Sequence, residues 1–405
     1  MKKYSKKIVT VISAVLCLTI CLATGFIVSG IDEEKPTVIE IRLKDDHPGI
    51  PGYDVKLAAM VYYGVEGSKD RISKEDYTIS CDVEEVIIDG DMITIPASFK
   101  DTTDLEGFNI YVKHNTDDTV IASYPYVIKK WEKTKGDDFD GASVDTNLWT
   151  VSDSTGTEDV GYGRSKGYDK NAVYIAEDTA NDGTKTKSMV LDYKVNDKTG
   201  TNKDATYITG CVDSKYSQVE GLFTASIKMP TEGGALNAFW TIPTTETWGK
   251  AWFATVRSGE REGMLMGEND IVEYSPNWKD ASGVPKCQIT DHFWYSDTLK
   301  VDSAKQHHVS YSSQNLKGKY VEFSMAWTPV GYYYYVDGEL VRTVKNIEST
   351  DEPATLRFQI LGSDFIESAD GKPDEGRSSW AGTFTHDNVV NGTMKMLVDY
   401  CYWYK

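Results

Sequence analysis

Apolar and polar side chains alternate along much of the chain with the period of two that β-strands require. In residues 321–328 every second residue is large and apolar, which predicts a half-buried strand. Residues 332–336 and 339–343 flank Asp337-Gly338, a pair suited to a type I′ turn, so this segment is predicted to be a β-hairpin. No long amphipathic helix stands out in the sequence. The pattern therefore predicts an all-β chain whose antiparallel sheets pack as a sandwich.

Residues 35–130 carry the strand pattern in shorter pieces. The apolar segments 86–88 and 92–95 flank Asp89-Gly90-Asp91, which is a tight hairpin signal. This stretch predicts a small immunoglobulin-like β-sandwich domain, followed by a second domain over residues 131–405. We interpret the first domain as a spacer. The alternative is a glycan-binding domain, whose candidate contacts are Tyr62, Tyr63 and Tyr124.

The stretch from Gly267 to Tyr274 places three carboxylates within six residues of a strand-like segment. Glu268 and Asp270 are two positions apart, so their side chains share one face of a strand. Glu273 is five positions from Glu268 and would point to the other face of a regular strand. A single β-bulge between Asp270 and Glu273 would return it to the first face. Crowded carboxyls separate their pKa values, which is what acid–base chemistry on a glycosidic bond requires.

Acidic clusters on strands are also found on solvated faces and around calcium ions. Aromatic residues near this cluster favour a carbohydrate site, because flat rings stack on sugars. The candidate sugar contacts are Trp240, Trp248, His292 and Trp294. The first precedes the acidic stretch by fewer than thirty residues, and the last two follow it in His292-Phe293-Trp294-Tyr295.

The sequence Glu268 to Glu273 matches Glu-x-Asp-x-x-Glu, and here the chain resembles glycoside hydrolase family 16, the laminarinase, lichenase and agarase group. Other segments resemble the family's strands in the same order, from about Trp131 to the C-terminus. They are Asp138-Phe139-Asp140-Gly141, Glu220-Gly221-Leu222-Phe223, residues 323–329, Tyr335-Val336-Asp337-Gly338 and Met396-Leu397-Val398-Asp399-Tyr400. An ordered set of matches is more specific than one short motif.

The resemblance implies a concanavalin-like jelly roll and a retaining mechanism. It implies that Glu268 is the nucleophile, that Glu273 is the acid and base, and that Asp270 sets the protonation of Glu268. No cofactor is required for this catalysis. The family also implies a structural calcium ion, held by Asp399 on the closing strand and by backbone carbonyls near the start of the domain. The alternative for Asp399 is a solvated or hydrogen-bonded carboxylate.

Two features depart from the family pattern. Asn269 stands where the signature usually carries Ile, and we expect its side chain to face away from the carboxylates. Residues 244–266 are an insertion, which puts the substrate class in doubt more than the mechanism.

The formal net charge of −19 disfavours binding to nucleic acid and to anionic membrane surfaces. At the N-terminus four lysines precede the apolar residues 8–28, so residues 1–30 are predicted to be a signal peptide or a membrane anchor. Both place the folded part in a secreted or cell-surface location, with possible membrane or cell-wall attachment. The cysteines beyond this segment are far apart and predict buried free thiols, although a bridge between two of Cys211, Cys287 and Cys401 stays open.

The sequence thus predicts an extracellular retaining endo-β-glycanase acting on a polysaccharide, foremost a β-1,3- or mixed-linkage β-glucan. The alternatives are a non-catalytic glycan-binding protein on the same fold, a transglycosylase, and a hydrolase of β-galactans.

Overall fold

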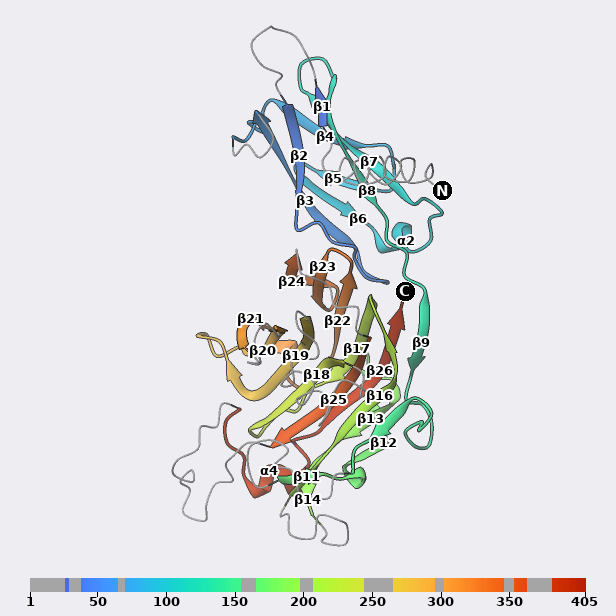
Figure 1. The fold of residues 1–405 in the computed structure, drawn as a ribbon, viewed down its shortest axis with the longest axis vertical. Coiled ribbons are helices and arrows are strands. Elements are labelled where there is room, and N and C mark those ends of the chain that lie inside the picture. The colour runs from blue at the N-terminus through green and yellow to red at the C-terminus, as the bar shows by residue number, and fades with distance from the viewer. Residues whose placement is uncertain are drawn as a thin grey trace, which may run out of the picture. The chain divides into compact units, whose positions relative to one another are not determined.

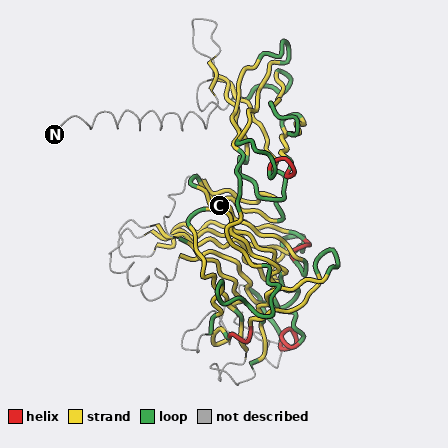
Figure 2. The backbone as a smooth tube through the Cα atoms, turned by 90° about the vertical axis from the view of Figure 1, so that its right-hand side faces the viewer, coloured by secondary structure: helices red, strands yellow, loops and turns green. Residues whose placement is uncertain are grey.

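The computed structural model describes residues 26–28, 38–64, 70–153, 165–196, 207–243, 265–295, 302–345, 353–362 and 381–405. The chain divides into two compact units, Met1–Trp131 and Glu132–Lys405. In the residues that the structure describes, both consist mainly of antiparallel strands joined by loops, and the helices there are short (Figure 1, Figure 2). The predicted all-β class is confirmed. Among the described residues no helix is both long enough and apolar enough to cross a bilayer.

The first unit contains two sheets in the ranges that the structure describes. One has the order β1 (Phe26–Val28), β2 (Val38–Lys44), β3 (Val55–Gly64), β6 (Met92–Ile95) and β5 (Ile87–Asp89). The other has the order β4 (Tyr77–Cys81), β7 (Gly107–His114) and β8 (Val120–Val127), and the short helix α2 spans Ala97–Lys100. Their apolar side chains share one buried cluster, to which Val55 and Ile110 belong. The predicted hairpin through Gly90 is present, because Asp89 pairs with Met92.

Most of the predicted leader, residues 1–30, lies outside the described residues. Within it the structure describes only β1, whose backbone pairs with residues 38–40 of β2.

The second unit contains two large sheets that face each other. We call the first the front sheet; among the described residues its order is β10 (Trp149–Val151), β16 (Cys211–Gln218), β25 (Ala354–Gly362), β18 (Ala235–Pro243), β19 (Leu265–Lys279), β20 (Pro285–Tyr295) and β21 (Asp302–Ser312). We call the second the back sheet; its order is β12 (Val173–Thr179), β13 (Lys185–Leu191), β26 (Met396–Tyr404), β17 (Gly221–Lys228), β22 (Tyr320–Thr328), β23 (Gly331–Val336) and β24 (Glu339–Lys345), and β9 (Lys133–Asp137) also pairs with β26.

Smaller elements complete this unit. The strands β11 (Ser165–Tyr168), β15 (Tyr207–Thr209) and β14 (Tyr193–Val195) form a small sheet. Two 3-10 turns, η1 (Lys170–Ala172) and η2 (Gln314–Leu316), and the helix α4 (His386–Val390) lie in the connections. The predicted hairpin of β23 and β24 turns through Asp337 and Gly338, which have φ angles of 46° and 78°. Both are positive, as a type I′ turn requires.

The strand predicted from residues 321–328 is more deeply buried than a half-buried strand. Val321, Phe323, Met325 and Trp327 do face the core. Ser324 on the opposite face is also fully buried. Its hydroxyl is not left unpaired there, because it forms a hydrogen bond of 2.6 Å with Thr224 Oγ1 on β17, which offsets the desolvation cost.

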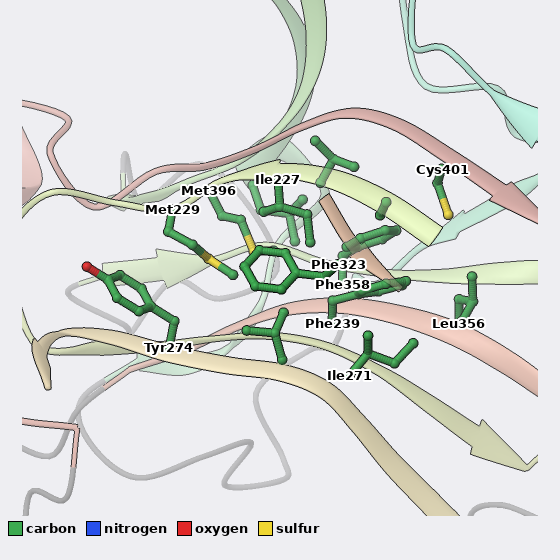
Figure 3. Packing of buried hydrophobic residues seen from close by; sticks show 14 of the residues in the cluster. Ile227, Met229, Phe239, Ile271, Tyr274, Phe323, Leu356, Phe358, Met396 and Cys401 are labelled. Atoms are coloured by element: carbon green, nitrogen blue, oxygen red, sulfur yellow. The ribbon is translucent and has the colours of Figure 1, made fainter. Parts of the chain in front are cut away.

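The core of the second unit lies between the two sheets (Figure 3). From the front sheet, Phe239 and Phe358 stack with ring centroids 4.7 Å apart and planes 7° from parallel. Other members of this cluster are Ile227, Met229, Ile271, Tyr274, Phe323, Leu356, Met396 and Cys401. Each large side chain buried in this way contributes roughly 1.5–3 kcal/mol of transfer free energy. The core thus fixes the inner face of β18, β19 and β25, and it leaves their outer face for chemistry.

The cysteines in the described part of the chain are free thiols. Cys211, Cys287 and Cys401 are fully buried in the second unit, and Cys81 in the first unit is partly buried. Desolvation raises the pKa of Cys211 and of Cys287 to about 12. The prediction of buried free thiols is therefore confirmed for the three cysteines of the second unit.

Candidate active site

The predicted bulge is present in β19. On one side, the pairing of β19 with β20 shifts register between Asp270 and Glu273. On the other side, Phe239 pairs with Val272 while the next residue, Trp240, pairs with Asp270, so that Ile271 is the extra residue. Ile271 and Val272 are consecutive, yet both point into the core. The strand thus skips one alternation, and Glu273 returns to the outer face of the front sheet.

Side chains of β20 confirm that the three carboxyls share this face. His292 Nε2 lies 3.0 Å from Asp270 Oδ2 and 3.8 Å from Glu268 Oε1. Thr290 Oγ1 donates a hydrogen bond of 3.3 Å to Glu273 Oε2. Thr290 and His292 are two residues apart on one strand and therefore project from the same face. The carboxyls that these two side chains contact must lie on that face as well.

Burial and mutual repulsion raise the pKa values of all three carboxyls. For Glu268 desolvation is the largest cause, the charge of Asp270 adds to it, and His292 opposes both. For Asp270 desolvation is again the largest cause, followed by the charge of Asp291. Desolvation and the charge of Asp270 raise the pKa of Glu273 to about 8. Buried carboxyls that repel one another do not all ionise together, so a proton is retained within the cluster near neutral pH.

The predicted sugar contacts have different outcomes. His292 lies within the carboxyl cluster. Trp240 lies on β18 directly opposite Asp270, on the same outer face, and only 8% of its surface is exposed. Trp248 lies outside the described residues. Trp294 lies on β20 opposite Met266, and its side chain is outside the described residues.

Next to the carboxyl cluster, the outer face of the front sheet carries a row of side chains that the sequence analysis did not predict. Asp213, Arg357 and Trp240 lie directly opposite one another on β16, β25 and β18. The Arg357 guanidinium donates hydrogen bonds of 2.5 and 2.9 Å to Asp213, and its central carbon lies 5.2 Å from the Trp240 ring centroid. Trp240 Nε1 donates to Gln359 Oε1 at 3.1 Å. Arg357 also opposes the rise in the pKa of Glu268.

The signal for this row is present in the sequence of β25. Thr355, Arg357 and Gln359 alternate there with Leu356, Phe358 and Ile360. This is the pattern of a strand with one polar and one apolar face. It predicts that Arg357 and Gln359 share a face, but it does not reveal which residues lie opposite them.

On its inner face β19 is tied to the back sheet by a buried polar network. Asn269 Nδ2 donates to Thr241 Oγ1 at 3.2 Å, and Asn269 Oδ1 accepts from the Tyr334 hydroxyl at 3.0 Å. The Arg342 guanidinium donates to Asp291, whose side chain is fully buried, and the Tyr334 hydroxyl shares its one hydrogen between Asn269 and Asp291. Asn269 therefore faces away from the carboxylates, as expected from its place in the signature.

Two groups of residues bear on metal binding. Ligand atoms of Glu268, Asp270 and His292 all lie within 4.8 Å of one another, a spacing that also occurs around metal ions. Asp399, the predicted calcium ligand, lies on the back sheet, where its Oδ1 accepts a hydrogen bond of 2.6 Å from Thr186 Oγ1. The two groups belong to different sheets, so a metal at Asp399 would have no part in the chemistry of the carboxyl cluster.

Comparisons with known proteins find similar solved structures. No family model and no curated protein matches the chain. The chain is similar to the laminarinase from Rhodothermus marinus, with 17% identity, a TM-score of 0.49, and 68% of this chain and 97% of that chain covered. The endo-β-1,3-glucanase from Pyrococcus furiosus has 19% identity, a TM-score of 0.47 and coverages of 68% and 94%. A glycoside hydrolase family 16 endo-glucanase from Bacteroides ovatus has 19% identity, a TM-score of 0.45 and coverages of 66% and 99%.

Proposed function

We propose that this chain is a retaining endo-β-glycanase that hydrolyses a polysaccharide at the outer face of its front sheet. The observation that carries the proposal is the bulge at Ile271, which returns Glu273 to the face that holds Glu268 and Asp270. A protein that only binds glycans needs no such arrangement. The match of Glu268 to Glu273 with the family 16 signature supports the same assignment.

In the first step, Glu268 would attack the anomeric carbon as a carboxylate. The bond from that carbon to the glycosidic oxygen breaks, and Glu273 donates its proton to the departing oxygen. This role suits a carboxyl whose pKa is raised to about 8, because such a group is mostly protonated at neutral pH. The product of the step is a glycosyl ester on Glu268.

In the second step, water would attack the same carbon from the side that the leaving group vacated. Glu273, now ionised, takes a proton from the water, and Glu268 departs as a carboxylate. Two inversions give net retention at the anomeric carbon. The pair of His292 and Asp270 lies beside Glu268 and would hold its carboxyl in position through both steps.

The substrate is proposed to be a β-1,3- or mixed-linkage β-glucan. Trp240, held between Arg357 and Gln359, supplies an aromatic group beside the carboxyls. Aromatic side chains pack against pyranose rings, and the 8% of Trp240 that is exposed would provide this contact. The N-terminal lysines and the apolar segment that follows them support a secreted or cell-surface location for the enzyme.

The test is release of reducing ends by the full chain from laminarin, mixed-linkage glucan, xyloglucan, agarose and carrageenan. Glu268→Gln is the matched control, because it keeps the size of the side chain and removes the nucleophile. Activity that the control lacks would support the proposal and identify the polymer. Product NMR should then show the β-anomer first, as retention requires. Binding to a polymer without release by either protein would favour a glycan-binding protein, and an inverted product would contradict the mechanism.

A further inference from the structure

Asp399 lies in a surface hollow of ≈ 560 Å³ on the outer face of the back sheet. The pairing of β26 with β17 shifts register here, because Ser226 pairs with Tyr400 and Ile227 pairs with Val398. Asp399 is the extra residue, so it and Tyr400 both line the hollow. Asp138 and Asp140, near the start of the unit, line the hollow as well. The closing strand and the start of the unit thus meet where a calcium ion would be expected.

The positively charged group at this place is a side chain of the protein, the ammonium group of Lys187. Lys187 Nζ donates hydrogen bonds of 2.8 Å to the Asp140 carbonyl and 3.3 Å to the Gly141 carbonyl. A hard metal ion at the start of the unit would need backbone oxygens of this kind. An ammonium group carries three donors and one positive charge, so it can satisfy several oxygens in the way that a bound ion does.

Of the four carboxylates that line the hollow, those of Asp399 and Asp138 accept hydrogen bonds from protein donors. Asp399 Oδ1 accepts from Thr186 Oγ1, one residue before Lys187 on β13. Asp138 accepts from the Tyr402 hydroxyl. A calcium ion binds six to eight oxygens at about 2.3–2.6 Å, so it would have to displace these donors. It would also have to share two carbonyls with a positively charged side chain. The expected calcium ligands, Asp399 and the backbone carbonyls near the start of the unit, are thus occupied by protein donors.

We propose that Lys187 takes the place of the structural calcium ion in this unit, so that the fold is complete without a metal. The geometry that points to this is the Lys187 ammonium on the Asp140 and Gly141 carbonyls, in the hollow that Asp399 also lines. The proposal concerns the back sheet alone and does not depend on the proposed activity. A calcium chelator should therefore leave the protein unchanged.

The experiment compares thermal unfolding of the full chain in EDTA, in calcium chloride and in magnesium chloride at equal ionic strength. The variants are Lys187→Met, which removes the charge and keeps the length, and Lys185→Met as the matched control. Lys185 lines the same hollow from the same strand, but its Nζ contacts Thr179 Oγ1 in place of the carbonyls. Calorimetric titration with calcium gives a second readout that does not depend on activity.

The unsubstituted protein and Lys185→Met are expected to have the same Tm in all three solutions and to give no calcium titration. Lys187→Met is expected to have a lower Tm in EDTA and to recover it in calcium, by on the order of 2–4 °C for a unit of this size. Adding Asp399→Asn to Lys187→Met should abolish that recovery. Calcium binding by the unsubstituted protein would overturn the proposal. So would a Lys187→Met variant that gains no response to calcium.

Discussion

His292 Nε2 lies 3.0 Å from Asp270 Oδ2, so a side chain of β20 holds the middle carboxyl of the β19 cluster. Replacing His292 with Phe removes this partner and leaves a buried carboxyl with one fewer hydrogen bond. A hydrogen bond to a charged group contributes about 1.5–3 kcal/mol, so kcat is expected to fall roughly 10- to 100-fold. KM on the polymer identified above should change less.

The control for that substitution is His308→Phe. His308 lies on β21 opposite Thr290, in the neighbouring strand of the same sheet, and it is exposed. Its replacement should leave kcat unchanged. Equal losses in the two variants would show that the His292 effect comes from general disturbance of the sheet.

The bulge at Ile271 gives a prediction about the removal of one residue from β19. Deleting Ile271 leaves Glu273 four positions after Glu268, so a regular strand without the bulge keeps both side chains on the outer face. Activity should therefore survive in the deletion variant if it folds. The conservative Ile271→Val keeps the bulge, should cost about 0.5–1.5 kcal/mol of stability and should retain activity. A deletion variant that folds by circular dichroism and has no activity would contradict the view that the bulge serves only to return Glu273 to the outer face.

The raised pKa of Glu273 predicts the alkaline limb of the pH profile. Glu273 must carry a proton to protonate the leaving oxygen, so kcat/KM should fall as the pH rises through about 8. Replacing Thr290 with Val removes a donor that favours the ionised form of Glu273, so the limb should move to higher pH. A limb that stays in place in Thr290→Val would assign it to another group.

The same pKa gives a prediction about stability. The pKa of Glu273 is raised in the folded state from 4.5 to about 8, so folding favours the protonated form. This contribution to stability is fully present below pH 4.5 and is lost as the pH rises to about 8. Glu273→Gln removes the ionisation, so it should stabilise the protein at pH 9 by about 1–3 kcal/mol and have little effect at pH 4. Urea unfolding at the two pH values measures the difference.

On the inner face of the front sheet, Asp291 and Arg342 form a buried ion pair. Substitutions of these two residues are expected to have strongly non-additive effects on the free energy of unfolding. Their side chains are 0% and 7% exposed, so removing either partner leaves an uncompensated buried charge. Asp291→Leu and Arg342→Leu should each cost about 3–5 kcal/mol, whereas the double variant should cost much less than their sum. A double-mutant cycle in urea tests this. Additive losses would show that the two charges do not stabilise each other.

The sequence predicts those parts of the site that are encoded locally. The bulge follows from the odd spacing of Glu268 and Glu273 within one strand, and the two hairpin turns follow from Gly90 and Gly338. Arg357 is different, because its partner Asp213 lies 144 residues away and only the register of β16 against β25 brings them together. The buried polar network on the inner face of β19 also depends on a long-range contact, since Asn269 and Tyr334 are 65 residues apart in the sequence. Contacts of this range depend on topology, which alternation alone does not specify.

The buried thiols of Cys211, Cys287 and Cys401 behave as apolar volume within the second unit. Thiols whose pKa values are raised hold almost no thiolate near neutral pH, and burial shields them from disulfide exchange. The folded unit therefore owes none of its stability to a disulfide among these three cysteines. A single cysteine added at its surface would be the one that reacts with a thiol-specific label.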